Sequence, residues 1–181
     1  MTSKSAFAAI LFAITCLPLS TSAATDISDL ITALGSDNDD TVENAIEKIS
    51  HLGPKGAPAV PALVRLLRNS NPHIRAHAAI ALGRMRKAAI PAVVVLARMV
   101  TDPDADVRHA ALDALAEIEP GKKMVVPLLL KALRDKDNTV VKRAVHALAE
   151  RGKEIVPAMI EALKDDRTEF YALLVLSLIH I

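Results

Sequence analysis

The chain has 181 residues, of which 51% are hydrophobic and only 2% aromatic. This composition suits helices that pack through small side chains, and it disfavours a β-sandwich built on aromatic and β-branched pairs. With 22 Lys and Arg against 21 Asp and Glu, the chain is nearly neutral, which argues against a nucleic-acid-binding protein because these carry a strongly basic surface.

Residues 1–24 are predicted to be a secretory signal peptide. Lys4 supplies a positive charge, a mostly apolar run extends to Leu17, and small residues lead to Ala24. The apolar run is shorter than the roughly 20 residues that span a bilayer. We therefore expect cleavage and export to the periplasm or the medium, with no stable membrane insertion afterwards.

Two alternatives to this signal peptide are an uncleaved anchor and a lipoprotein signal with modification of Cys16. Thr15 disfavours the second, because that position normally carries a smaller residue. Cys16 is the single cysteine of the chain, so a cleaved chain would contain no thiol and no disulfide.

From residue 26 onwards the sequence repeats itself every 33 residues. The step is the same for alanines, for aliphatic residues and for capping residues, as three columns show: Ala45, Ala78, Ala111 and Ala144; Ile49, Leu82, Leu115 and Leu148; Asn38, Asn71, Asp104 and Asp137. A period of this length is the signature of stacked helical repeats, each of which buries its apolar face only against its neighbours. The sequence predicts an all-α fold, an α-solenoid of antiparallel helix pairs.

Each unit is predicted to hold two helices joined by a short solvated corner. In the clearest unit, Asn71 caps the first helix, Gly83 and the basic run 84–87 end it, and Pro91 opens the second. The predicted solenoid, 25–175, then divides into a half-unit at 26–35, full units at 36–68, 69–100, 101–134 and 135–164, and a partial unit at 165–175.

The end of the chain is predicted to be unusual. Phe170, Tyr171, Leu173, Leu174 and Leu176 have no following unit to cover them, so we expect an exposed apolar surface. Residues 176–181 resemble the translation of a transposon end used in sequencing libraries, which suggests read-through into adapter. A genuine hydrophobic terminus is the alternative.

The motif that begins at Ile74-Arg75 and continues through Ala81-Leu82-Gly83 resembles a short HEAT repeat of the phycobilisome-lyase-like subtype. Ankyrin and tetratricopeptide repeats are disfavoured because their turn and aromatic patterns are absent. The resemblance implies that an Arg after an aliphatic residue and an acid in the following loop bridge adjacent units. It assigns this structural role to Arg75, Arg108, Asp102 and Asp135.

No catalytic residue, metal ligand or cofactor is predicted. Deoxyhypusine hydroxylases resemble this repeat class and bind iron through His-Glu pairs, but no His here precedes Glu. A metal site would need His73, His77, Asp106 and His109 to converge, and we expect solvated surface histidines instead.

A basic ladder is the most informative surface pattern. Its main members lie 33 residues apart and directly follow buried positions of the second helices, and two more basic residues flank them: Arg65, Arg98, Lys131 and Lys164, with Arg68 and Arg134. We expect the second helices to line the concave face, where the ladder would bind an acidic segment of a partner protein. The alternative is that these residues only complement helix dipoles, because all lie near helix C-termini.

The sequence therefore predicts a non-catalytic scaffold for protein–protein interaction. The first alternative is a lyase-like or chaperone subunit for a chromophore protein. The second is an N-terminal fragment of a larger exported protein whose activity lies elsewhere.

Overall fold

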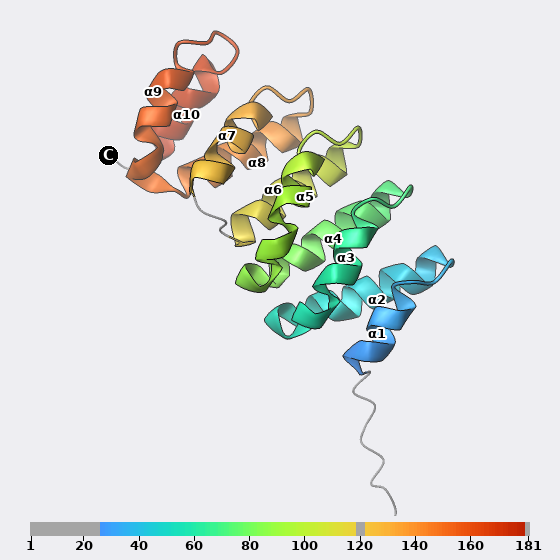
Figure 1. Cartoon of the computed structure of the whole chain (residues 1–181). Helices are drawn as coiled ribbons and strands as arrows, with labels where there is room; N and C mark the ends of the chain where they lie inside the picture. The colour runs from blue at the N-terminus through green and yellow to red at the C-terminus, as the bar shows by residue number, and fades with distance from the viewer. Residues whose placement is uncertain (1–25, 119–121, 180–181) are drawn as a thin grey trace, which may run out of the picture.

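A computed structural model describes residues 26–118 and 122–179, all of them in helices or in the turns between helices. The predicted signal peptide, residues 119–121 between two of the predicted helices, and the last two residues lie outside this range. The α-helices are α1 (Ile27–Ala33), α2 (Asp39–His51), α3 (Val60–Leu66), α4 (Pro72–Arg84), α5 (Val93–Met99), α6 (Ala105–Ile118), α7 (Lys122–Ala132), α8 (Asn138–Ala149), α9 (Val156–Ala162) and α10 (Glu169–Leu178). The predicted all-α solenoid is confirmed (Figure 1).

The helices pack as five pairs among the described residues. Each odd-numbered helix packs on the helix that follows it, from α1 with α2 to α9 with α10. Helix α1 thus has α2 as its packing partner, and α10 has α9.

The predicted capping residues begin the longer helix of each pair. Asn38, Asn71 and Asp137 accept hydrogen bonds from the amides of Thr41, His73 and Thr139 at 3.1, 3.0 and 2.8 Å. Asp104 accepts from the amides of Asp106 and Val107. These side chains satisfy amides that have no partner within the helix.

The corners between pairs are more ordered than the solvated turns expected from the sequence. Three of them form 3₁₀ helices, η1 (Gly53–Ala59), η2 (Arg86–Ala92) and η3 (Gly152–Ile155). Pro91 lies inside η2, and α5 begins only at Val93.

Helix α4 ends at Arg84, within the basic run expected from the sequence, and Gly83 is its penultimate residue. Gly83 is buried, and a Cβ atom at this position would lie 2.9 Å from the Cα of Ala114 on α6. Only glycine allows two helix backbones to approach so closely. The left-handed turn that ends α4 is instead made by Arg86, at φ 56°.

The repeated apolar columns form one continuous core. The four alanines of the first column are buried at 0 to 2% exposure, and the Ile49 column is fully buried. Both columns belong to the same hydrophobic cluster, which runs from Leu30 to Ile179. Each pair of helices thus buries its apolar faces against its neighbours, as a stacked repeat requires.

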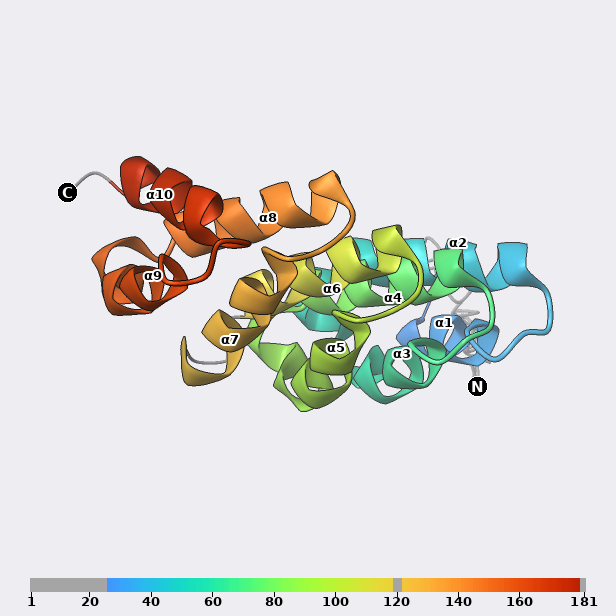
Figure 2. The ribbon, with the colours of Figure 1, turned by 90° about the horizontal axis from the view of Figure 1, so that it is seen from above.

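The pairs form two rows of helices, and the stack is curved. Helices α2, α4, α6, α8 and α10 make the inner row, and α1, α3, α5, α7 and α9 make the outer row (Figure 2). Neighbours in the inner row pack directly on one another, whereas direct contact between α3 and α5 or between α5 and α7 is sparse. The row with closer spacing must lie inside the curve, so the inner row forms the concave face.

The last helix leaves one face open. Ala172 and Val175 of α10 are buried against α8 and α9. Phe170 and Leu173 are 69% and 53% exposed, and Leu174 and Leu178 are also exposed. The helix runs past residue 175 as far as Leu178.

Candidate partner-binding surfaces

Two partly buried ion pairs join adjacent helix pairs along one edge of the stack. Arg75 of α4 donates to both carboxylate oxygens of Asp102, at 3.0 and 2.8 Å. Arg108 of α6 does the same to Asp135, at 2.7 Å for both bonds. These four residues are the ones to which the resemblance assigned bridging roles, and the structure brings each pair together.

Each of these arginines also ties down the loop before its own helix. Arg75 donates to the carbonyls of Asn69 and Ser70, and Arg108 donates to those of Asp102 and Pro103. Asp102 and Asp135 each accept a backbone amide two residues further on. This network fixes the angle between neighbouring pairs, and hence the curvature of the stack.

The electrostatics of the ion pair between Arg108 and Asp135 follow from this geometry. The hydrogen bond from Arg108 to Asp135 raises the pKa of the guanidinium above its ordinary value. Burial tends to raise the pKa of Asp135, but the bonds from Arg108 and from the amide of Asp137 outweigh it, so the pKa is lowered overall. The pKa of Asp137 is lowered by hydrogen bonds from Thr139. The charged forms are thus favoured on both sides of the bridge.

The basic ladder does not lie where the sequence analysis expected it. Arg65, Arg98 and Lys131 are exposed residues of α3, α5 and α7, and Lys164 directly follows α9. These helices form the outer row, so the ladder faces the convex side and not the concave side. The expectation failed because the sequence repeat does not show which row lies inside the curve.

Some members of this set already have acidic partners. Lys164 donates to both carboxylate oxygens of Glu161 at 2.8 Å, and Arg134 pairs with Asp165 in the next loop. Arg68, like Arg134, lies in a loop after an outer-row helix and is exposed. The ladder is therefore a discontinuous basic surface that is partly neutralised at its C-terminal end.

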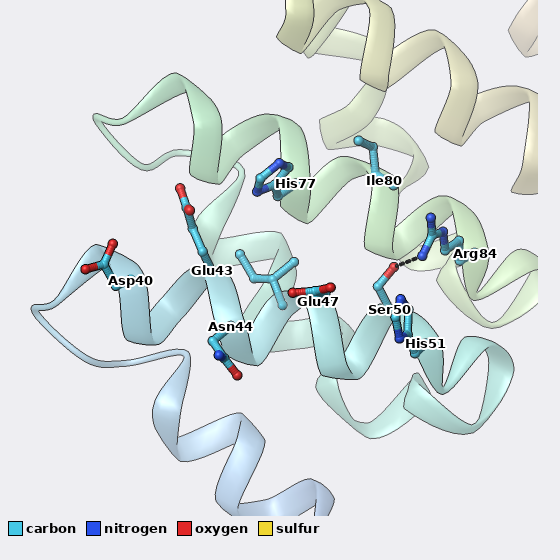
Figure 3. A pocket seen from close by; sticks show the side chains of 10 residues that line it. Asp40, Glu43, Asn44, Glu47, Ser50, His51, His77, Ile80 and Arg84 are labelled. Carbon is cyan, nitrogen blue, oxygen red and sulfur yellow. Dashed lines mark hydrogen bonds between the residues drawn. The ribbon is translucent and has the colours of Figure 1, made fainter.

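The concave face has a groove between α2 and α4, which we call the α2/α4 groove (Figure 3). Its volume is about 560 Å³. The side chains come from two consecutive inner-row helices: Asp40, Glu43, Asn44, Ile46, Glu47, Ser50 and His51 from α2; His77, Ile80 and Arg84 from α4. From the sequence, His77 among them was considered as a metal ligand, and none was predicted to bind a partner.

The two ends of the α2/α4 groove differ in charge. Arg84 donates to the hydroxyl of Ser50 at 3.1 Å, which holds its guanidinium at one end (Figure 3). Glu43 and Glu47 approach the middle from α2, facing His77 on α4. Ile46 is buried beneath them, and Ile80 is 39% exposed. The groove therefore combines carboxylates with an apolar floor.

A second groove of about 600 Å³ lies between α4 and α6 and reaches α8. Its charges are largely paired. Arg143 of α8 contacts Asp113 of α6, and Arg86 contacts Glu117 at 2.8 Å. His109 lies 3.7 Å from Asp113, and burial together with the nearby Arg143 lowers its pKa. With Arg84, which lines both grooves, this groove has three arginines against two acids, in contrast to the first.

The remaining chemical options gain no support in the described part of the chain. No group of three or more His, Cys, Asp or Glu within residues 26–118 and 122–179 is arranged to bind a metal. No helix in these same ranges is long and apolar enough to cross a bilayer.

The chain belongs to the HEAT-repeat family, because a HEAT-repeat family model matches residues 27–99 and 92–178. Among solved structures, it is similar to a designed armadillo repeat protein in complex with the peptide (KR)4, with 19% identity, a TM-score of 0.64 and coverage of 85% of this chain and 82% of that chain. A search of curated proteins finds no significant match.

Two natural proteins share the fold. The complex of CpcE and CpcF of phycocyanin lyase from Nostoc sp. PCC7120 is 22% identical, with a TM-score of 0.56 and coverage of 77% of this chain and 58% of that chain. An archaeal HEAT-like repeats protein from Thermococcus onnurineus NA1 is 14% identical, with a TM-score of 0.57 and coverage of 86% and 71%. At these identities the likeness concerns the fold.

Proposed function

We propose that this protein is a non-catalytic scaffold whose concave face, formed by α2, α4, α6 and α8, binds a segment of a partner protein. The observation that carries the proposal is the position of the two inner-row grooves. Both lie between consecutive helices of this one face, and residues of α4 line both. This face therefore offers recessed contacts between consecutive helices, and a partner segment can lie in either groove.

The physical basis of binding would be many shallow contacts presented by a rigid surface. The fully buried core and the two bidentate bridges fix the relative positions of the inner-row helices. Preorganisation of this kind reduces the entropy lost on binding. Other proteins with this fold support a binding role, since one structural neighbour is a peptide complex and another is the complex of CpcE and CpcF.

The narrower expectations from the sequence are retained as separate proposals. An acidic partner segment would have to bind the convex ladder, where Arg65, Arg98 and Lys131 are exposed. Export after removal of residues 1–24 would be tested by the N-terminal sequence of the protein recovered from its natural source. A role beside a chromophore protein has only the fold of the lyase subunits to support it.

Site-specific photo-crosslinking tests the concave surface directly. A photoreactive residue replaces Asn44 or Ile80 on the concave face, and Arg65 or Arg98 on the convex face, in protein produced in its natural source. We expect one discrete crosslinked product from the concave positions and none from the convex ones. Products from the convex positions alone would overturn the proposal and favour the basic ladder.

A further inference from the structure

The α2/α4 groove has an excess of acidic charge that the neighbouring groove between α4 and α6 lacks. Asp40, Glu43 and Glu47 all line it. None of the three forms an ion pair with another described residue, whereas Asp113 and Glu117 of the neighbouring groove are paired with arginines. The acids of the neighbouring groove are thus neutralised within the protein, and these three are not.

The basic groups around the groove do not neutralise these carboxylates. Arg84 lies at the far end, where it donates to Ser50, and the other titratable groups are His51 of α2 and His77 of α4. Lys48 of α2 does not line this groove; it lines the cavity between α1 and α2, which Asp40 also borders, and it forms no ion pair with Asp40. The groove therefore offers three carboxylates against one engaged arginine and two histidines.

The spacing of the acids suits a chain in extended conformation. Asp40, Glu43 and Glu47 follow one stripe of α2 and span seven residues, which corresponds to about 10 Å along a helix. Alternate side chains of an extended segment lie about 7 Å apart on one face. Two basic side chains at alternate positions would therefore both reach carboxylates, while the exposed Ile80 contacts their aliphatic stems.

We propose that the α2/α4 groove binds a basic segment of a partner protein in extended conformation, with Lys or Arg at alternate positions. The inference rests on the proposed function and assigns a chemical class to the partner. It reverses the charge expected from the sequence, because the acidic surface of this protein, and not its basic ladder, lies on the concave face.

Peptide binding measured by fluorescence anisotropy tests this proposal. The probe is a fluorescein-labelled peptide Gly-Lys-Gly-Arg-Gly-Lys-Gly-Arg, at about 50 mM salt so that charge pairs are only weakly screened. We expect binding by the wild type and about tenfold weaker binding by the double variant Glu43→Gln/Glu47→Gln, since two partly exposed ion pairs together stabilise a complex by roughly this factor.

The matched control is the double variant Asp37→Asn/Asp166→Asn. It changes the net charge equally at two exposed loop positions outside the groove, and its affinity should stay within about twofold of the wild type. Because Glu43 is half-buried, thermal melts check folding, and Asp40→Asn/Glu47→Gln provides a second groove variant at exposed positions.

Three results would overturn the proposal: no binding of the basic probe, equal loss in groove and control variants, or equal binding of a probe with Glu in place of Lys and Arg. Each of these is distinguishable from failure of the proposed function. Crosslinking from Asn44 or Ile80 in the natural source would show a partner on the concave face even if that partner is not basic.

Discussion

Arg86 has a backbone conformation that ordinary side chains rarely adopt. Its φ of 56° matches those of Gly53 and Gly152, which occupy the same turn in other units at 54° and 64°. For a residue with a Cβ atom, this region costs about 1–2 kcal/mol. The ion pair with Glu117 offers little compensation, because both side chains are largely exposed.

Replacement of Arg86 should therefore separate backbone strain from charge. Arg86→Gly and Arg86→Ala both remove the ion pair, but only Gly relieves the strain. We expect the Gly variant to be more stable than the Ala variant by about 1 kcal/mol in urea unfolding. Equal stabilities, or a more stable Ala variant, would show that the turn is not strained at this position.

The bridge between Arg108 and Asp135 should make stability depend on pH in a defined direction. The pKa of Asp135 is lowered in the folded protein, so its contribution is present above the ordinary carboxyl value near 4 and is lost as pH falls through the lower folded value. We expect Asp135→Asn to lower the free energy of unfolding by about 3 kcal/mol at neutral pH, because it leaves a buried arginine without its charge partner.

Urea unfolding at pH 7 and at pH 3 would check this expectation. The difference between wild type and Asp135→Asn should shrink at the lower pH. Asp166→Asn is the control, since Asp166 is exposed and its replacement should change stability by no more than about 0.5 kcal/mol. A difference for Asp135→Asn that does not vary with pH would exclude a role for the carboxylate charge.

At the scale of helices, the close contact between α4 and α6 depends on the absence of a Cβ atom at Gly83. In most helices Gly→Ala stabilises by up to about 1 kcal/mol. At Gly83 the added Cβ would meet the backbone of Ala114, so Gly83→Ala should destabilise by about 1–3 kcal/mol in urea unfolding, as overpacked cores do. A stabilised variant would contradict the close approach of the two helices.

The alanine column makes a related prediction within the core. Ala111 is fully buried between helices of adjacent pairs. Ala111→Leu would add three carbon atoms where no space is available, and we expect a loss of about 1–3 kcal/mol. The melting temperature measures this effect, and an unchanged value would argue against the packing of this column.

At the scale of the whole molecule, the sequence was sufficient to predict the solenoid fold but not to predict which row of helices forms the concave surface. The 33-residue columns predict which residues are buried, because burial repeats with the unit, and the buried Ala45 column agrees. Periodicity cannot reveal the direction of curvature, which depends on the relative spacing of the two rows. The composition of the helices did indicate the direction of curvature. Gly83 and the alanines of α4 and α6 allow these helices to pack more closely than the bulkier helices of the outer row.

The acidic groove was missed for a related reason. Asp40, Glu43 and Glu47 do not repeat from unit to unit, so a search for columns passes over them. Arg65 and Arg98 do repeat, and this regularity favoured the ladder as a site. Repetition identifies what the fold requires or tolerates in every unit, whereas a binding site on a solenoid can be confined to one pair of neighbours.

The central claim is that the concave inner row, and its α2/α4 groove in particular, is the binding surface of this HEAT-repeat protein. An NMR titration of the isotope-labelled protein with the basic peptide tests it most directly. We predict shift changes at the amides of Glu43, Glu47 and His77, with Arg65, Arg98 and Lys131 unaffected. Changes confined to the latter three residues, or spread evenly over both rows, would contradict the claim.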